Sequence, residues 1–316
     1  YPFTTNQFEG NSTPTRAGGT VQLQYTFQAP RGRYCWKSVR ITVGDPFDLF
    51  VKTIELETEI DVLVLPKQVA VKSPKWTPRY TLRAPGIHLS RQPGAGVDFF
   101  GVREYQLGDP LRWIHWRQTA RHPNQLFSKE FEREEMADIG LILDGSVAAN
   151  LRNGSEELFE YSVQAAAVIA GSVIRGGNRL SLLALGERVG RVFPGTGKYQ
   201  LERILNQLAS CRPGESVSLN TLKYLPVRLF PSRCMIILVS PLSGSDYPII
   251  ARLLASGYQV LVVSPDPVEF ARRGVHQPLA VRAAAVERAT LLWRIREIGA
   301  RVVDWPIFQK VTHTNG

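Results

Sequence analysis

The sequence predicts an α/β protein whose doubly wound, mainly parallel sheet is preceded by a small antiparallel β domain. From residue 136 onward, short apolar runs alternate with helical stretches. The runs are continuously apolar, which is typical of parallel strands buried on both faces. Right-handed crossovers between such strands produce an open sheet with helices on both sides. Residues 18–65 instead alternate apolar and polar side chains, the period of half-buried strands.

Residues 1–72 predict the small β domain, which we expect to be sandwich-like. Residues 21–27 alternate most clearly, and two further strand-like runs follow at 34–43 and 54–65. Three strands are few for a free-standing domain. We therefore expect that the domain is truncated at its start, and that an upstream portion supplied more strands.

Residues 73–97 predict a linker between the domains. They contain Pro74, Pro78, Pro85 and Pro93 among basic residues and glycines. Proline removes a backbone donor and interrupts helices and sheets, so we expect this segment to cross the protein surface.

Residues 98–135 are dense in charged and aromatic side chains and predict an extended segment, a turn, a short helix and a strand. Asp109 and Pro110 favour the start of the helix, because an acidic cap and a proline suit its first positions. Residues 126–132 have the mixed pattern of an edge strand. The segment contains a candidate network of charged and aromatic residues, namely Arg103, Glu104, Tyr105, Asp109, Arg112, Trp116, Arg121 and Glu132.

Residues 136–316 predict the α/β domain, because strand-length and helix-length stretches alternate there. The expected strands are 139–143, 180–185, 189–193, 234–239, 259–263 and 302–303, and the expected helices are 156–175, 199–208, 247–255 and 281–298.

Composition excludes several classes of protein. A hydrophobic content of 44% and a charged content of 21% are those of a globular chain. The net charge of +10 is spread along the sequence without a nucleic-acid-binding motif, so we expect no nucleic-acid partner. The three cysteines have no metal-site spacing and favour a reducing compartment. No apolar run is long enough to cross a bilayer.

The segment from Phe99 to Glu134 resembles the signature of the bacterial domain-of-unknown-function 58 family. The matching residues are Phe99, Gly101, Arg103, Tyr105, Gly108, Asp109, Arg112, Ile114, Trp116, Thr119, Ala120, Arg121, Phe131, Glu132 and Glu134. The resemblance implies an upstream membrane anchor that has been removed from this sequence. It also implies a location at the cytoplasmic face of the inner membrane and a MoxR-type AAA+ ATPase as partner.

The loop after the first strand of the α/β domain is similar to the D-x-S-x-S loop of von Willebrand factor A domains. Asp144 and Ser146 match that pattern, whereas Ala148 replaces its second serine. The resemblance implies a degenerate Mg²⁺ site, with Thr196 as a loose stand-in for a third ligand. The distal aspartate is expected near Pro241, which offers no side-chain oxygen. We therefore expect weak Mg²⁺ binding at most.

Two interpretations of the charged and aromatic network are open. In the first, Trp116 packs inward, and the arginines pair with carboxylates to lock the segment onto the next domain. In the second, Trp116 and the arginines form a surface that a partner recognises.

Our leading hypothesis is a non-enzymatic, membrane-tethered scaffold or adaptor that binds protein partners during the assembly or maturation of other complexes. We expect docking at the carboxyl rim of the sheet, near Asp144, the 194–198 turn and Asp246. One alternative is a metal-dependent adhesion-type module that uses Asp144, Ser146 and Thr196. Another is a phosphoester hydrolase that uses His115 and Asp109.

Overall fold

The protein is represented by a computed structural model that divides into two compact units, residues 1–66 and 67–316. The structure describes residues 29–44, 49–67, 88–122, 124–147, 150–154, 156–214, 219, 225–272, 278–305 and 307.

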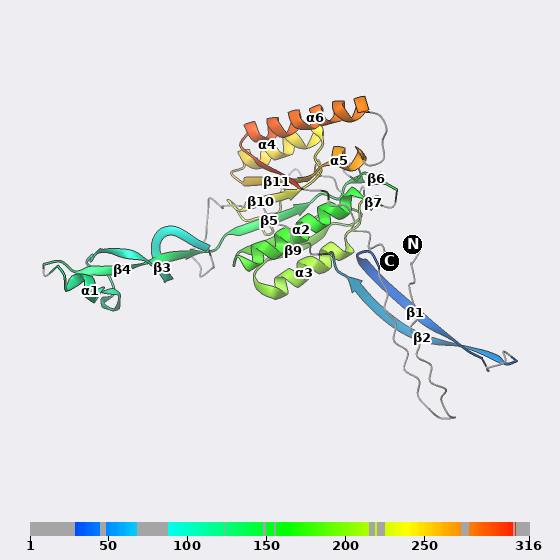
Figure 1. The fold of residues 1–316 in the computed structure, drawn as a ribbon, viewed down its shortest axis with the longest axis horizontal. Coiled ribbons are helices and arrows are strands. Elements are labelled where there is room, and N and C mark those ends of the chain that lie inside the picture. Colours follow the sequence, from blue (N-terminus) through cyan, green and yellow to red (C-terminus); the bar gives the residue numbers. More distant parts are fainter. Residues whose placement is uncertain are drawn as a thin grey trace, which may run out of the picture. The chain divides into compact units, whose positions relative to one another are not determined.

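The first unit contains a long antiparallel hairpin of β1 (Gly32–Gly44) and β2 (Val51–Val64), drawn in blue in Figure 1. The register shifts by one residue near Trp36, which marks a β-bulge. Arg33 forms an ion pair diagonally across the hairpin with Asp61, because Arg33 lies opposite Leu63 and Asp61 lies opposite Cys35. The strands predicted at 34–43 and 54–65 are confirmed, and the strand predicted at 21–27 lies outside the described residues.

A second antiparallel hairpin joins β3 (His88–Glu104) to β4 (Phe127–Glu135). The connection holds a short 3₁₀ helix, η1 (Leu111–Trp113), and the short α1 (Trp116–Thr119). β3 begins inside the predicted linker range and contains Pro93. The strand tolerates this proline because Pro93 lies at one of several irregularities in the register.

The third sheet forms the centre of the α/β domain and has the strand order β12-β11-β10-β5-β8-β9. Every neighbouring pair is parallel except β8 with β9. The sheet is therefore mixed and mostly parallel. Its strands match the predicted ones: β5 (Asp138–Leu143), β8 (Arg179–Ala184), β9 (Gly190–Gly195), β10 (Met235–Val239), β11 (Gln259–Pro265) and β12 (Arg301–Trp305).

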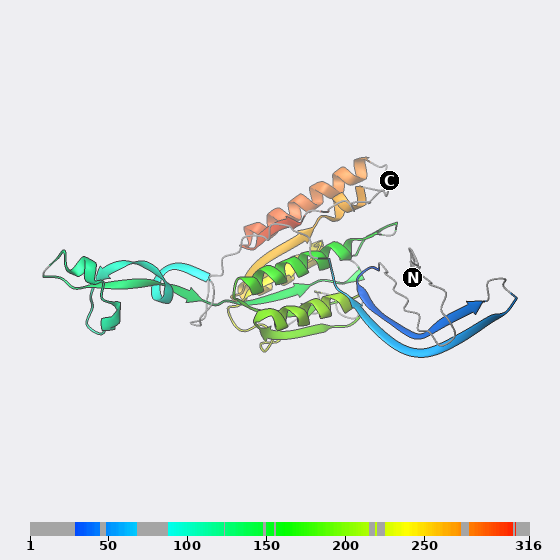
Figure 2. The same cartoon turned by 60° about the horizontal axis from the view of Figure 1, so that its bottom comes forward.

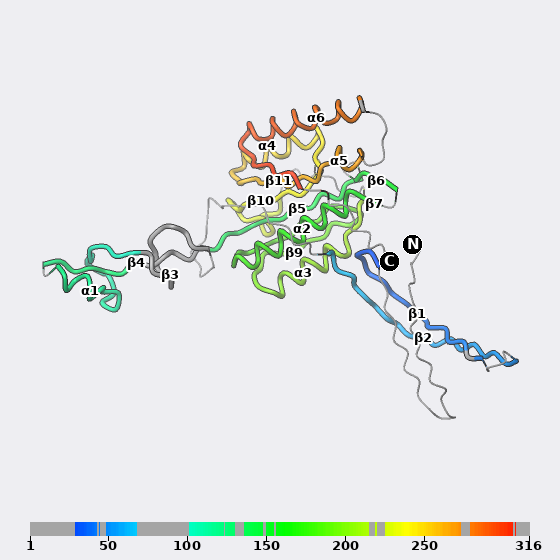
Figure 3. The backbone as a smooth tube through the Cα atoms, viewed as in Figure 1, coloured from blue at the N-terminus to red at the C-terminus, as the bar shows by residue number. Residues whose placement is uncertain are grey.

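Helices cover the sheet on both sides, and Figures 1 and 2 show two groups of them. One group is α2 (Leu158–Arg175) and α3 (Gly197–Ser210), and the other includes α4 (Tyr247–Ala255) and α6 (Pro278–Glu297). These four confirm the predicted helices. The shorter elements were not predicted from the sequence: α5 (Pro267–Arg272), η4 (Gly244–Asp246), β6 (Arg152–Asn153) and β7 (Glu156–Glu157). The tube in Figure 3 follows the same path of the chain.

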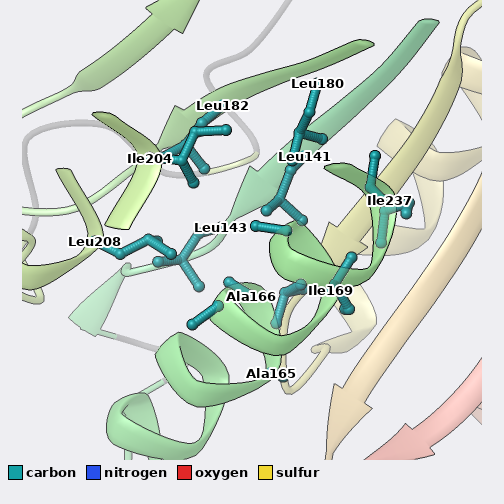
Figure 4. Packing of buried hydrophobic residues seen from close by; sticks show 14 of the residues in the cluster. Leu141, Leu143, Ala165, Ala166, Ile169, Leu180, Leu182, Ile204, Leu208 and Ile237 are labelled. Atoms are coloured by element: carbon teal, nitrogen blue, oxygen red, sulfur yellow. The ribbon is translucent and has the colours of Figure 1, made fainter. Parts of the chain in front are cut away.

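Two apolar clusters lie on opposite faces of the sheet, because successive strand residues point to opposite sides. Leu141 packs with Leu182 and with the helices α2 and α3, as Figure 4 shows. The next residue, Ile142, packs in the other cluster with side chains of α4 and α6. Among the described residues, no helix is both long and apolar enough to span a bilayer.

Candidate functional site

The turn after β3 is organised around the carboxylate of Asp109. Its Oδ1 accepts a hydrogen bond from Arg103 Nη2 at 2.7 Å, and its Oδ2 accepts one from the backbone N–H of Gln106 at 3.0 Å. The Tyr105 hydroxyl donates to the Asp109 carbonyl oxygen at 3.2 Å. The Arg103 guanidinium, followed by the Gln106 N–H, lowers the pKa of Asp109 below its ordinary value. The Asp109 carboxylate is therefore ionised and paired with Arg103, and it stabilises the turn.

The single helix predicted from Asp109 is wrong, because the chain forms η1 and α1 with a break between them. Ile114 adopts extended backbone angles and forms an isolated bridge with Ser128 of β4. The N–H of His115 then donates to the carbonyl of Phe127 at 2.8 Å. Ile114 is 4% exposed, so its burial against the hairpin outweighs local helix propensity.

Several large side chains lie in solvent within residues 105–126, which we call the signature tip. Trp116 is 67% exposed, Leu111 is 72% exposed and Leu107 is fully exposed. The prediction that Trp116 packs inward is therefore wrong. Figure 1 shows α1 at the turn end of the β3–β4 hairpin.

The charge that the signature tip presents to solvent is mainly positive. Arg112, Arg117 and Arg121 are exposed, whereas Arg103 and Asp109 neutralise each other. Of the predicted network, the structure thus brings together Arg103, Tyr105 and Asp109, and it leaves Arg112, Trp116 and Arg121 at the surface. Glu104 is also exposed, and the side chain of Glu132 lies outside the described part of the chain.

The second candidate region is the carboxyl rim, formed by the loops that follow β5, β10 and β11. Asp144 follows β5 and is only 3% exposed. Its Oδ1 accepts from the N–H of Ser146 at 3.1 Å, and its Oδ2 accepts from Ser240 Oγ at 2.8 Å. Burial raises the pKa of Asp144, although these hydrogen bonds act in the opposite direction.

A second buried carboxylate, Asp246, lies on the same rim and is 5% exposed. It accepts hydrogen bonds from the N–H and the hydroxyl of Ser243 at 2.7 and 3.0 Å, which caps η4. Burial raises the pKa of Asp246, and the negative charge of Asp144 raises it further. Both acids are engaged inside the protein, so the rim does not offer them to a partner as expected.

Thr196 lies at the opposite end of the sheet, so the prediction that it joins Asp144 in a metal site is wrong. β9 is antiparallel to β8, and Gly195 pairs with Leu180 near the amino end of β8. The separation from the carboxyl rim is roughly 13 Å of strand, at about 3.3 Å per residue. Within the described residues, no group of three or more His, Cys, Asp or Glu could hold a metal ion.

The residues of the hydrolase hypothesis are engaged in local structure. His115 Nδ1 accepts the N–H of Gln118 at 3.1 Å and caps α1, while Asp109 is held by Arg103. A general base needs a free lone pair within reach of the proton that it removes. This geometry gives the hydrolase no support, and the hypothesis stays untested.

Comparison with known proteins gives the family. A family model described as "Protein of unknown function DUF58" matches residues 101–278, which is more than half of the chain. The chain belongs to the DUF58 family. The match covers the signature tip and most of the α/β domain, so both candidate regions lie within the DUF58 part of the chain.

The relatives of this DUF58 chain that were found are uncharacterised bacterial proteins. It is 28% identical to the uncharacterised protein YeaD of Bacillus subtilis over 183 residues, which is 58% of this chain and 43% of that protein. It is also 28% identical over 252 residues to Mb1516 of Mycobacterium bovis and Rv1480 of Mycobacterium tuberculosis, covering 69% of this chain and 77% of each relative. The chain therefore spans less than half of the Bacillus relative.

Two rim residues of this DUF58 chain were not predicted from the sequence. Ser240, rather than Pro241, meets Asp144, and its position directly after an apolar strand could have indicated this. Arg288 of α6 was not singled out either. Its guanidinium contacts the carbonyl of Pro241 at 3.1 Å, Asp266 at 3.2 Å and Asp304 at 2.9 Å, so it ties together the loops after β10 and β11 and the strand β12.

Proposed function

We propose that this protein is a non-enzymatic adaptor that binds a protein partner through its signature tip. The observation that carries the proposal is the 67% exposure of Trp116, accompanied by the exposed Leu107 and Leu111. Keeping large apolar side chains in water forgoes the free energy that burial would release. Tryptophan is also enriched among the residues that dominate binding energy at protein interfaces. These side chains are thus suited to be buried by a partner.

The charge of the signature tip defines the chemistry of the partner. Arg112, Arg117 and Arg121 are exposed in the same short segment as the apolar side chains, so the complementary surface is acidic and contains an apolar pocket for Trp116. Arginine is favoured at such sites because its planar guanidinium binds carboxylates through two hydrogen bonds. The resemblance described above identifies a MoxR-type AAA+ ATPase as the partner to test, with no nucleic acid involved.

The α/β domain is, in this proposal, a degenerate von Willebrand factor A-like module that positions the binding surface. Its support is the mostly parallel sheet, with Asp144 and Ser146 in the loop after β5. The proposal also includes a membrane anchor upstream of this sequence and a location at the cytoplasmic face of the inner membrane. The process served is the assembly or maturation of other complexes.

The test is surface plasmon resonance between this chain and the MoxR-type ATPase of the same organism. Trp116→Ala is expected to weaken binding by roughly tenfold or more, as for an anchor residue. Arg112→Glu combined with Arg121→Glu is expected to weaken it further and to remove most of its salt dependence. The matched control is Phe193→Ala, which truncates an aromatic side chain of β9 that is 52% exposed.

Two results would refute the proposed site. One is equal loss of affinity in Trp116→Ala and in the Phe193→Ala control. The other is unchanged affinity in both signature-tip variants, which would place the interface elsewhere on the chain. Titration with Mg²⁺ tests the adhesion-type alternative, because that alternative requires saturable binding that disappears in Asp144→Ala.

A further inference from the structure

The helix α6 has two different faces. Its inner face includes Ile295, which is fully buried in the second apolar cluster, and Arg288, which makes the rim contacts described above. These two residues are seven positions apart and therefore lie on the same side of the helix. Figure 1 shows α6 beside α4 on one side of the sheet.

The outer face of α6 carries a continuous seam with the spacing of a coiled coil. Its members follow one another at alternating intervals of four and three residues, which keeps them on one side of a helix. All of them are exposed: Leu279, Ala283, Val286, Thr290, Trp293 and Glu297. We call this set the α6 seam.

The large members of the α6 seam extend into solvent. Leu279 is 78% exposed, Val286 is 66% exposed and Trp293 is 59% exposed. They span about 21 Å of helix at 1.5 Å per residue. The small residues Ala283 and Thr290 leave gaps between them, into which side chains of another helix could fit.

The two flanks of the α6 seam differ in charge. On one flank, Arg282, Ala289 and Arg296 follow one another at seven-residue intervals, and all are exposed. No acidic residue occupies this line of the helix. On the other flank, Ala280, Glu287 and Arg294 follow one another at the same interval, so this flank carries both signs of charge. The guanidinium of Arg294 lies 4.6 Å from the centre of the Tyr247 ring. The charged residues of the first flank, Arg282 and Arg296, are therefore both basic, and they lie beside the surface that a partner would cover.

We propose that the α6 seam docks one helix of a partner protein, apolar along one face and carrying Asp or Glu beside that face. The apolar face covers Leu279, Val286 and Trp293, and the acidic positions pair with Arg282 and Arg296. Such helix-on-helix recognition uses anchors spaced by three, four and seven residues. This surface is separate in sequence from the signature tip, so the inference is independent of the proposed function.

A second copy of this chain is the less favourable occupant. An antiparallel, two-fold pairing could set Ala283 of one copy against Trp293 of the other, which matches a small residue to a large one. The same register brings Arg282 of each copy next to Arg296 of the other. Two pairs of like charges would then flank the contact, and like-charge contacts across an interface are costly.

The experiment uses the full chain and two synthetic helical peptides of the same length as α6. Both peptides have leucine and alanine alternating along one face, and they differ only in having glutamate or lysine at every position of one flank of that face. Isothermal titration calorimetry is expected to show saturable binding of the glutamate peptide and at least about tenfold weaker binding of the lysine peptide.

Variants of α6 locate the binding. Val286→Asp places a charge in the middle of the seam and is expected to weaken the binding of the glutamate peptide by roughly tenfold or more. Arg282→Glu combined with Arg296→Glu is expected to reverse the preference, so that the lysine peptide binds more tightly. The matched control is Arg191→Glu combined with Arg203→Glu, which changes the net charge equally at exposed positions of β9 and α3.

Three outcomes overturn the inference. The first is no saturable binding of the glutamate peptide. The second is an equal loss of binding in the control double variant, which would mean that only overall charge attracts the peptide. The third is a concentration-dependent dimer in light scattering that Val286→Asp abolishes, because the occupant would then be a second copy. Circular dichroism melts of each variant establish that the fold is retained.

Discussion

Asp144 is a buried acid whose two carboxylate oxygens already have hydrogen-bond donors within the protein. Ser146 and Ser240 supply them, from the loops after β5 and β10. Burial still disfavours the ionised form, and it raises the pKa of Asp144 above its ordinary value of 3.8. Asp144 therefore stabilises the rim as a hydrogen-bond acceptor but costs stability when it carries a charge.

The first prediction concerns the pH dependence of this cost. Because the pKa is raised in the folded state, the contribution of Asp144 to stability is fully present below the unfolded value and is lost as pH rises through the folded value. Asp144→Asn cannot ionise. The unfolding free energy of the parent should therefore fall relative to that of Asp144→Asn as the pH is raised from below 3.8 to neutral.

Urea denaturation of both proteins across this pH range measures the difference. Glu202→Gln, which removes an exposed carboxylate on α3, is the matched control. A difference between parent and Asp144→Asn that stays constant with pH would contradict the prediction.

The second prediction is that Trp116→Ala leaves the fold intact. Trp116 is 67% exposed, so its truncation removes little buried area. The unfolding free energy should change by less than about 0.5 kcal/mol, as for ordinary surface substitutions. Chemical denaturation provides the measurement. A loss of several kcal/mol would mean that Trp116 packs inward after all.

At the scale of elements, α6 is fastened to the carboxyl ends of three strands through one side chain. Arg288 bonds the Pro241 carbonyl after β10, the Ser264 hydroxyl in β11 and the Asp304 carboxylate in β12. The Asp266 carboxylate also pairs with Arg288, and its Oδ1 accepts the N–H of Val268 at the start of α5. Several backbone and side-chain oxygens thus depend on one guanidinium.

The third prediction follows from this dependence. Arg288→Ala should lower the unfolding free energy by roughly 1–3 kcal/mol, because it removes one donor each from the buried Pro241 carbonyl and Ser264 hydroxyl, which keep only their bond to each other. Arg288→Lys should restore only part of the loss, since an ammonium group cannot reproduce the planar fork. Thermal melting with Arg282→Ala as the exposed control tests this. Equal stability of Arg288→Ala and the control would show that the network contributes nothing.

At the scale of the whole molecule, the described apolar core belongs to the second unit. All the clusters of buried apolar residues consist of residues from Ala137 onward. The first unit, as described, is a two-stranded hairpin in which Val39, Ile54 and Leu56 are at least 39% exposed. A two-stranded hairpin without a packed face is marginally stable in water.

The fourth prediction is that residues 67–316 fold without residues 1–66. The melting temperature of the shortened chain should match the main transition of the full chain, because the described core clusters lie entirely within residues 137–307. The hairpin alone, residues 29–66, should show no cooperative transition. Differential scanning calorimetry of the full chain and the two fragments measures these thermal transitions. A shortened chain that melts well below the full chain would show that the first unit contributes to the core.

The sequence by itself determined the six strands of the central sheet and the four long helices of the α/β domain. The runs that became β5, β10 and β11 are continuously apolar, because both faces of a central parallel strand are buried. The glycine pair at Gly176 likewise marked the end of α2. These signals are local, so they can be recognised from neighbouring residues without knowledge of the fold. The family signature can be recognised for the same reason, because it is contained in one continuous segment.

The tertiary structure decided which functional residues meet. Ser240 reaches Asp144 across 96 positions of sequence, and the antiparallel direction of β9 carries Thr196 to the other end of the sheet. Ile114 and His115 pair with β4 and divide a helix that the local sequence favours, and Trp116 is exposed. Strand direction and long-range pairing depend on the whole chain, and therefore no local pattern could specify them.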